Sequence, residues 1–162
     1  MTPYHGVVAV HLLAAIVWLG GAFFIALVGA PVLRGVESPE LRRRLFEQLG
    51  LRFRRVGWAA IAVLIVSGLV LLEQRGVLGS GVLGSAAFWR TRFGGALAWK
   101  LGAVGAMLAA SAAHDLWLSG AAMRARPGSP EALRLRRLSL LLARGAAVLG
   151  VVIVVLAVRL AR

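Results

Sequence analysis

The feature that most constrains this chain is a run of 28 residues, from Gly6 to Leu33, that contains no Asp, Glu, Lys or Arg. A helix of about 20 apolar residues crosses the roughly 30 Å hydrocarbon core of a bilayer. The run is too long for the apolar part of a cleaved signal peptide, and no Lys or Arg precedes it. The sequence therefore predicts a membrane-spanning helix over about residues 6–29.

Three further apolar runs predict three further crossings, over about residues 56–73, 95–118 and 138–158. Of the whole chain, 60% is apolar and 15% is charged, whereas soluble domains are about 45–50% apolar and about 25% charged. We expect an all-α, polytopic membrane protein in which residues 1–162 form a single domain, built as a four-transmembrane-helix bundle.

Two stretches ahead of crossings carry the signals of a helix start. A Ser-Pro-Glu sequence at residues 38–40 precedes an amphipathic pattern over residues 39–54, which predicts an interfacial helix. A second Ser-Pro-Glu sequence stands at residues 129–131. We expect both helices to lead into the crossings that follow them.

The arginines are unevenly divided among the segments that flank the crossings. The first and third connections hold twelve, whereas the N-terminal stub, the second connection and the C-terminal tail hold five. Lys and Arg gather in the cytoplasmic loops of membrane proteins, so we expect both termini outside and the chain in the inner (plasma) membrane, with membrane lipids as partners. The twelve are Arg34, Arg42, Arg43, Arg44, Arg52, Arg54, Arg55, Arg124, Arg126, Arg134, Arg136 and Arg137.

The composition also excludes several classes of function. The chain has no Cys, which excludes disulfides, iron–sulfur clusters and thiol nucleophiles. The net charge of +13 does not indicate a nucleic-acid partner, because the charges follow loops and not the face of a soluble module. Gly79, Gly81 and Gly84 match the spacing of a dinucleotide-binding fingerprint, but they lie between two crossings and not in a βαβ unit. We interpret this stretch as a linker.

Five ionisable residues lie at membrane depth, where a charge is costly and usually faces the inside of a bundle. They are His11, Lys100, His114, Asp115 and Arg144. We interpret Asp115 and Arg144 as an ion pair that offsets the cost of inserting both. A proton relay that includes His114 is the alternative.

Seven-residue spacing places several candidates on shared helix faces. Lys100, Met107 and His114 are seven apart, as are His11 and Trp18, and each step of seven drifts by only about 20°. If each crossing starts at the outer membrane surface, His11 and Lys100 lie at a similar depth. Along its helix, His114 lies about 21 Å farther from that surface than Lys100. We therefore expect that His11 and His114 do not ligate one iron within a single subunit.

The chemistry of these side chains suggests a cofactor site. Imidazole is a common metal ligand and a usual proximal ligand of heme iron, so His11 is either such a ligand or a satisfied interior histidine. Lys100 can ligate, pair with a carboxylate such as a heme propionate, or snorkel to the membrane surface. Trp18 and Met107 are further candidate cofactor contacts, and for Met107 the alternative is core filler. His5 and His114 are further candidate metal ligands.

The first crossing resembles that of a known family. Residues 11–34 show a His, then Trp-x-Gly, then an Arg at the helix end, and this pattern is similar to the opening helix of the CopD copper-resistance membrane domain and of the related HemJ-type protoporphyrinogen oxidases. The Trp-Lys-Leu sequence at residues 99–101 resembles the Lys-containing third helix of that superfamily. The resemblance implies a four-helix unit that binds heme b or copper, with His11 as the ligating histidine and Lys100 as the matching lysine.

Three functions remain open at this point. The first is a heme b membrane protein with a redox role, either electron transfer or porphyrinogen-type oxidation by an oxidoreductase. The second is copper binding and uptake, which the lack of Cys and the three Met residues disfavour because Cu(I) prefers thiolate and thioether. The third is a cofactor-free bundle whose polar residues fix helix register. A homodimer and a redox partner such as a quinone are compatible with the first.

Overall fold

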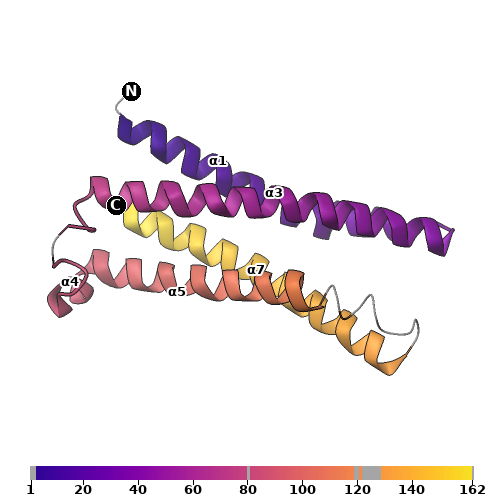
Figure 1. Ribbon diagram of the computed structural model, residues 1–162. Coiled ribbons are helices and arrows are strands. Elements are labelled where there is room, and N and C mark those ends of the chain that lie inside the picture. The colour runs from indigo at the N-terminus through magenta and orange to yellow at the C-terminus, as the bar shows by residue number, and fades with distance from the viewer. Residues whose placement is uncertain (1–2, 80, 119–120, 122–128, 162) are drawn as a thin grey trace. The chain divides into compact units, whose positions relative to one another are not determined.

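The computed structural model describes residues 3–79, 81–118, 121 and 129–161 (Figure 1). Every regular element in these ranges is a helix, and four helical stretches are long and apolar enough to cross a membrane. They are Pro3–Arg34, Pro39–Gln74, Arg92–Asp115 and Pro130–Val158. These stretches confirm the expected all-α, multi-pass membrane architecture. Arg124 and Arg126, which contribute to the predicted orientation, lie outside the described residues.

Contacts divide the chain into two compact units, Met1–Gly84 and Ser85–Arg162, and the single domain expected from the sequence stays a prediction. Unit 1 contains α1 (Pro3–Phe24), the π-helical segment η1 (Ile25–Gly29), α2 (Ala30–Arg34) and α3 (Pro39–Gln74). The π-helical widening has a local cause, because Pro31 lacks an N–H and its ring excludes the carbonyl four residues earlier.

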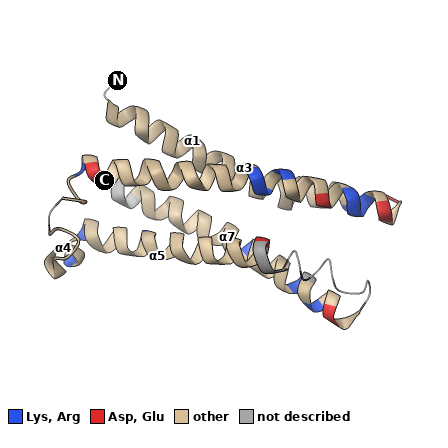
Figure 2. Ribbon diagram, in the orientation of Figure 1, with Lys and Arg blue, Asp and Glu red and all other residues tan. Residues whose placement is uncertain are grey.

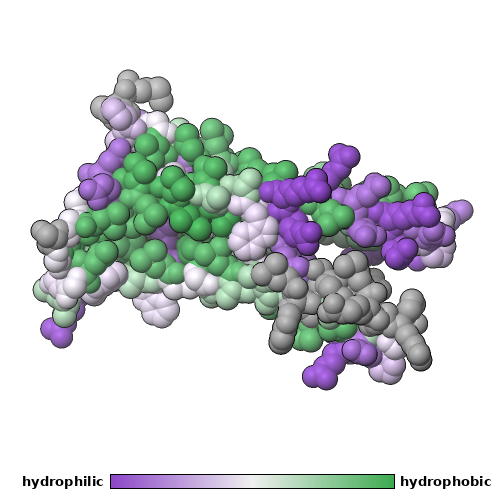
Figure 3. All heavy atoms as spheres, viewed as in Figure 1, coloured by the Kyte–Doolittle hydropathy of each residue, from purple (hydrophilic) through white to green (hydrophobic). Residues whose placement is uncertain are grey.

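Helix α3 is a single continuous helix of 36 residues. The Ser38 hydroxyl caps it by accepting a hydrogen bond from the backbone N–H of Leu41 at 3.3 Å, which confirms the predicted start. The segment expected as an interfacial helix is therefore the first half of the same helix that crosses the membrane. The arginine residues of α3 gather on this half (Figure 2). The space-filling view shows the same half as largely hydrophilic, beside an apolar remainder (Figure 3).

Helices α1 and α3 run antiparallel and pack through small residues. A Cβ placed on Gly57 would lie 3.7 Å from Cδ1 of Trp18, and a Cβ placed on Gly21 would overlap the ring of Phe53. Each glycine thus leaves room for an aromatic ring from the other helix. Apolar packing of this kind, and not hydrophobic exclusion from water, associates helices inside a bilayer.

The linker after α3 contains the sequence Gly-Val-Leu-Gly-Ser twice, at residues 76–80 and 81–85. The first residues of the two copies, Gly76 and Gly81, have φ angles of 68° and 84°. These are left-handed conformations that glycine adopts without the steric cost of a Cβ. The glycines therefore serve backbone turns, which agrees with the interpretation of this stretch as a linker.

Unit 2 contains α4 (Ala86–Arg90), α5 (Arg92–Ala112), the π-helical segment η2 (Ala113–Leu118) and α7 (Pro130–Ala161). Helix α5 packs along α7. The Ser129 hydroxyl accepts a hydrogen bond from the N–H of Ala132 at 3.2 Å, so the second Ser-Pro-Glu sequence also starts a helix, as predicted.

The corner between α4 and α5 depends on Thr91. Its hydroxyl donates to the carbonyl of Phe88 at 2.7 Å and accepts from the N–H of Gly94 at 3.0 Å. We expect Thr91→Ala to lower the free energy of unfolding by about 1 kcal/mol, because both bonds of this N-cap are lost. Reversible unfolding in mixed micelles measures the change. Thr91→Ser keeps the hydroxyl and should stay close to the parent, whereas equal stability of the Ala variant and the parent would contradict the capping role.

Candidate functional site

In unit 1, a partly buried hydrogen bond between side chains joins α1 to α3. His11 of α1 and Ser67 of α3 lie 56 residues apart in sequence, and Nδ1 of His11 is 2.8 Å from Oγ of Ser67. Ser67 is 6% exposed. We call this pair, with the groove beside it, the α1–α3 half-site.

The hydrogen bonds of Ser67 favour one tautomer of His11. The hydroxyl of Ser67 has a carbonyl acceptor within α3, the oxygen of Val63 at 2.5 Å. When its proton is donated there, the hydroxyl oxygen accepts from His11, which favours a proton on Nδ1 of the imidazole. In the neutral ring, the lone pair that can bind a metal then lies on Nε2.

Gly68, next to Ser67, lies on the side of α3 that faces the imidazole. A Cβ at this position would be 3.5 Å from Cε1 of His11, which is ordinary van der Waals contact, so this position also has room for alanine. The hydrogen bond to Ser67 orients a His11 side chain that is itself half-buried.

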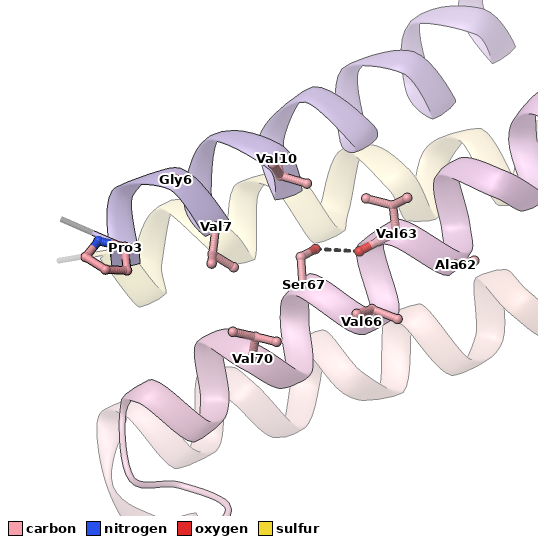
Figure 4. A pocket seen from close by; sticks show the side chains of 9 residues that line it. All are labelled: Pro3, Gly6, Val7, Val10, Ala62, Val63, Val66, Ser67 and Val70. Atoms are coloured by element: carbon pink, nitrogen blue, oxygen red, sulfur yellow. Dashed lines mark hydrogen bonds between the residues drawn. The ribbon is translucent and has the colours of Figure 1, made fainter. Parts of the chain in front are cut away.

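An apolar groove of about 570 Å³ runs between α1 and α3 beside this pair (Figure 4). Ser67 lies in its wall and is the one residue with a polar side chain among the nine that line it, and His11 is not one of the nine. The lining residues are Pro3, Gly6, Val7, Val10, Ala62, Val63, Val66, Ser67 and Val70.

A second polar contact closes one end of the half-site. The guanidinium of Arg75 donates to the hydroxyl of Tyr4 at 2.8 Å, and its Cζ lies 6.0 Å from the centre of the Tyr4 ring. The ring of His5 stands edge-on to Tyr4, with centroids 5.9 Å apart. The structure therefore places His5 beside Tyr4 and not beside His11, which is six residues and roughly 240° away on the helix.

Trp18, a candidate cofactor contact, lies in the packing between α1 and α3. It is 8% exposed, and its indole lies against Gly57. The stripe that His11 and Trp18 share is therefore the α3-facing side of α1. Trp18 holds the register that brings His11 to Ser67, whether or not it also contacts a bound group.

The other candidates belong to unit 2 and form the α5–α7 half-site. Met107 is 5% exposed and Lys100 is half-buried, both on α5. Nδ1 of His114 is 2.9 Å from Oδ1 of Asp115, and these side chains are 35% and 19% exposed. Both residues lie in η2, and π-helical turns are frequent at functional sites. Arg144 has an exposed position on α7, and its pairing with Asp115 stays a prediction.

Neither half-site contains a ready cluster of ligands for a bare metal ion. Within the residues that the structure describes, no three His, Cys, Asp or Glu side chains come together in a way that could hold such an ion. Sequence reasoning found His11 but missed Ser67, its partner. The signal was a lone hydroxyl, followed by a glycine, in the middle of an otherwise apolar crossing.

Comparisons with known proteins place the chain in a family. The model of the family described as copper resistance protein D (CopD) matches residues 47–160, more than half of the chain. This range includes Ser67, Lys100, Met107 and His114, whereas His11 precedes it.

A curated relative comes from Aquifex aeolicus (strain VF5), where it is described as an uncharacterized protein. It is 32% identical over 110 residues, which are 66% of this chain and 64% of the relative. The chain thus spans somewhat less than two thirds of the relative that it matches. No solved structure matches the chain. By the match over residues 47–160, which confirms the resemblance to the CopD domain, the chain belongs to the CopD family of membrane proteins.

Proposed function

We propose that this CopD-family protein binds heme b within the membrane, through Nε2 of His11, and has a redox role. The observation that carries the proposal is the hydrogen-bonded series from His11 to Ser67 to the carbonyl of Val63. Metal-ligating histidines usually donate their other ring N–H to such a partner, which fixes the tautomer and the ring orientation. His11 has this arrangement inside an apolar crossing.

The number of available ligands favours heme over a bare metal ion. A porphyrin supplies four of the iron ligands, so one or two side chains complete the site. A bare ion needs most of its ligands from the protein, and no cluster of three His, Cys, Asp or Glu side chains occurs within the described ranges. One oriented histidine in an apolar helix pair therefore suits heme better.

Other residues of the half-site have distinct roles in this proposal. Ser67 is a positioning residue, because it acts through His11. The valines of the groove exclude water, and Arg75 offers a guanidinium that suits a carboxylate such as a propionate. Bound heme would supply one-electron exchange at its iron. Lys100 and Met107 are further proposed cofactor contacts, from unit 2.

The resemblance to HemJ-type oxidases suggests the kind of reaction. Oxidation of a porphyrinogen, or electron transfer to a partner such as a quinone, would each use heme in this way. We further propose an inner-membrane location with the N-terminus outside, supported by the twelve arginines of the first and third connections. We also propose that the protein forms a homodimer.

Copper binding is the second candidate, and the family description favours it. Thioether sulfur and imidazole are suitable ligands for copper. Met107 and His114 are seven residues apart in α5–η2, and His114 already bonds a carboxylate through Nδ1. In this alternative the α5–α7 half-site, and not His11, would hold the metal.

Absorption spectroscopy and metal analysis of the purified full chain separate the two candidates. With a heme precursor supplied during expression, we expect a Soret band that shifts on reduction by dithionite, with iron near one atom per chain or per dimer. A colourless protein that retains copper would reject heme and support the second candidate. A colourless protein that retains neither would reject both.

A further inference from the structure

Helix α4 carries aromatic and cationic side chains on different sides. At 100° per residue, Arg90 lies about 150° around the helix from the midpoint between Phe88 and Trp89. Arg90 is exposed, whereas the two aromatic side chains are half-buried. The ring of Phe88 stands edge-on to those of Trp89 and Phe93, with centroids 5.1 Å and 6.2 Å away. The aromatic side of α4 therefore contacts the first turn of α5, and Arg90 lies on the other side.

The corner between α4 and α5 joins these two helices closely (Figure 1). The hydroxyl of Thr91 bonds to the backbone on both sides of the corner. A Cβ on Gly94 would overlap the carbonyl oxygen of Phe88, so the two backbones are in contact here. A group that binds to the end of α4 therefore also positions the start of α5.

A second exposed arginine, Arg92, is the first residue of α5. Trp99 follows seven residues later, which places it only about 20° away around the helix and about 10 Å along it. The side of α5 that carries both is open, since Trp99 is 75% exposed. Neither Arg90 nor Arg92 forms a salt bridge with a carboxylate in the described part of the chain. One side of α5 thus presents a guanidinium at the end of the crossing and an indole farther in.

The order of these groups along α5 is that of the layers at a bilayer surface. Arginine is suited to phosphate, because its planar group donates two parallel hydrogen bonds. Tryptophan is enriched where headgroups meet hydrocarbon. The membrane-spanning stretch runs from Arg92 past Trp99 to Asp115. The acyl chains of a lipid whose phosphate lies at Arg92 therefore extend in the same direction as α5, on the side that carries the indole.

We propose that Arg90 and Arg92 bind the phosphate of an anionic phospholipid whose acyl chains run along α5 over Trp99. Two guanidinium groups favour a lipid with a net negative charge, because choline already neutralises the phosphate of phosphatidylcholine. Inorganic phosphate would satisfy the arginines but leave the indole uncovered. A second copy of the chain would cover the indole but bring like charges together. The proposal does not depend on heme, since neither arginine is a proposed cofactor contact.

Quenching of Trp99 fluorescence by lipids with brominated acyl chains tests the proposal at this position. The full chain is reconstituted in two mixtures of phosphatidylglycerol and phosphatidylcholine that have the same composition and differ in which lipid is brominated. The signal of Trp99 is the difference between each protein and the same protein with W99F. Any bound cofactor affects both mixtures equally, so the comparison between the two lipids is unchanged by it.

We expect the apparent affinity at Trp99 to be about tenfold higher for phosphatidylglycerol than for phosphatidylcholine. The variant R90Q/R92Q should lose most of this preference. The matched control is R134Q/R137Q, which removes the same charge from α7 in the same unit and should keep the preference. A circular dichroism spectrum checks that each variant is folded.

Four outcomes would overturn the proposal. The first is equal quenching of Trp99 by the two lipids, and the second is equal loss of preference in both double variants, which would indicate diffuse charge attraction. The third is loss of the preference in millimolar inorganic phosphate at constant ionic strength, which would make free phosphate the ligand of the arginines. The fourth is a Trp99 that neither brominated lipid quenches, which would show that protein covers this side of α5.

Discussion

Replacing His11 with alanine is expected to remove the Soret band from the purified protein and to lower its heme content by more than about 100-fold. The reason is that His11 is proposed to supply the iron-binding nitrogen, and loss of even an outer partner of such a ligand costs about 10–100-fold in metal affinity. The measurement is heme per protein, from the absorption spectrum and iron analysis of the variant and the parent prepared in parallel.

The matched control for this variant is His5→Ala, on the same helix. His5 lies beside Tyr4 and not beside Ser67, so its removal should leave the spectrum unchanged. His114→Ala is the control in unit 2. An unchanged spectrum in His11→Ala would reject the ligand assignment, and loss of the band in His114→Ala alone would move the site to the α5–α7 half-site.

Replacing Gly94 with alanine is expected to destabilise unit 2 by about 1–3 kcal/mol, the usual cost of forcing extra volume into a packed site. A Cβ at this position would overlap the carbonyl oxygen of Phe88 and lie 3.1 Å from Oγ1 of Thr91. The overlapped atom belongs to the backbone, so it cannot move aside as a flexible side chain would. Reversible unfolding in mixed micelles measures the loss.

Gly95→Ala provides a control one residue away. Its Cβ would lie 3.7 Å from the carbonyl oxygen of Trp89, which is ordinary contact. Alanine also has the higher helix propensity, so this variant should be neutral or slightly stabilising. If both variants behave alike, the close packing at the corner between α4 and α5 is not the cause of any change.

Both helix starts and the CopD resemblance could be predicted from the sequence, because each depends on a short local pattern. The Ser-Pro-Glu sequences at residues 38–40 and 129–131 place a hydroxyl where the first turn has unsatisfied N–H groups. The amphipathic stretch over residues 39–54 has the composition of an interfacial helix, and no breaker separates it from Val56. The prediction that it leads into the next crossing is confirmed, because α3 continues through both.

The candidate site could be predicted only in part. His11 stood out because an ionisable group at membrane depth is costly in any arrangement. Ser67 did not stand out, because a lone serine in a crossing is common and can bond its own helix, as Ser67 also does with Val63. The orientation of the imidazole became visible only when both helices were placed.

The sequence by itself determined where the chain crosses a membrane, because hydrocarbon requires a minimum length of apolar helix and this is a property of consecutive residues. Only the tertiary structure decided which polar groups meet. The register between α1 and α3 is set by glycines of one helix that receive aromatic rings of the other, Gly57 for Trp18 and Gly21 for Phe53. This complementarity joins two distant segments, so neither segment alone reveals that His11 lies opposite Ser67.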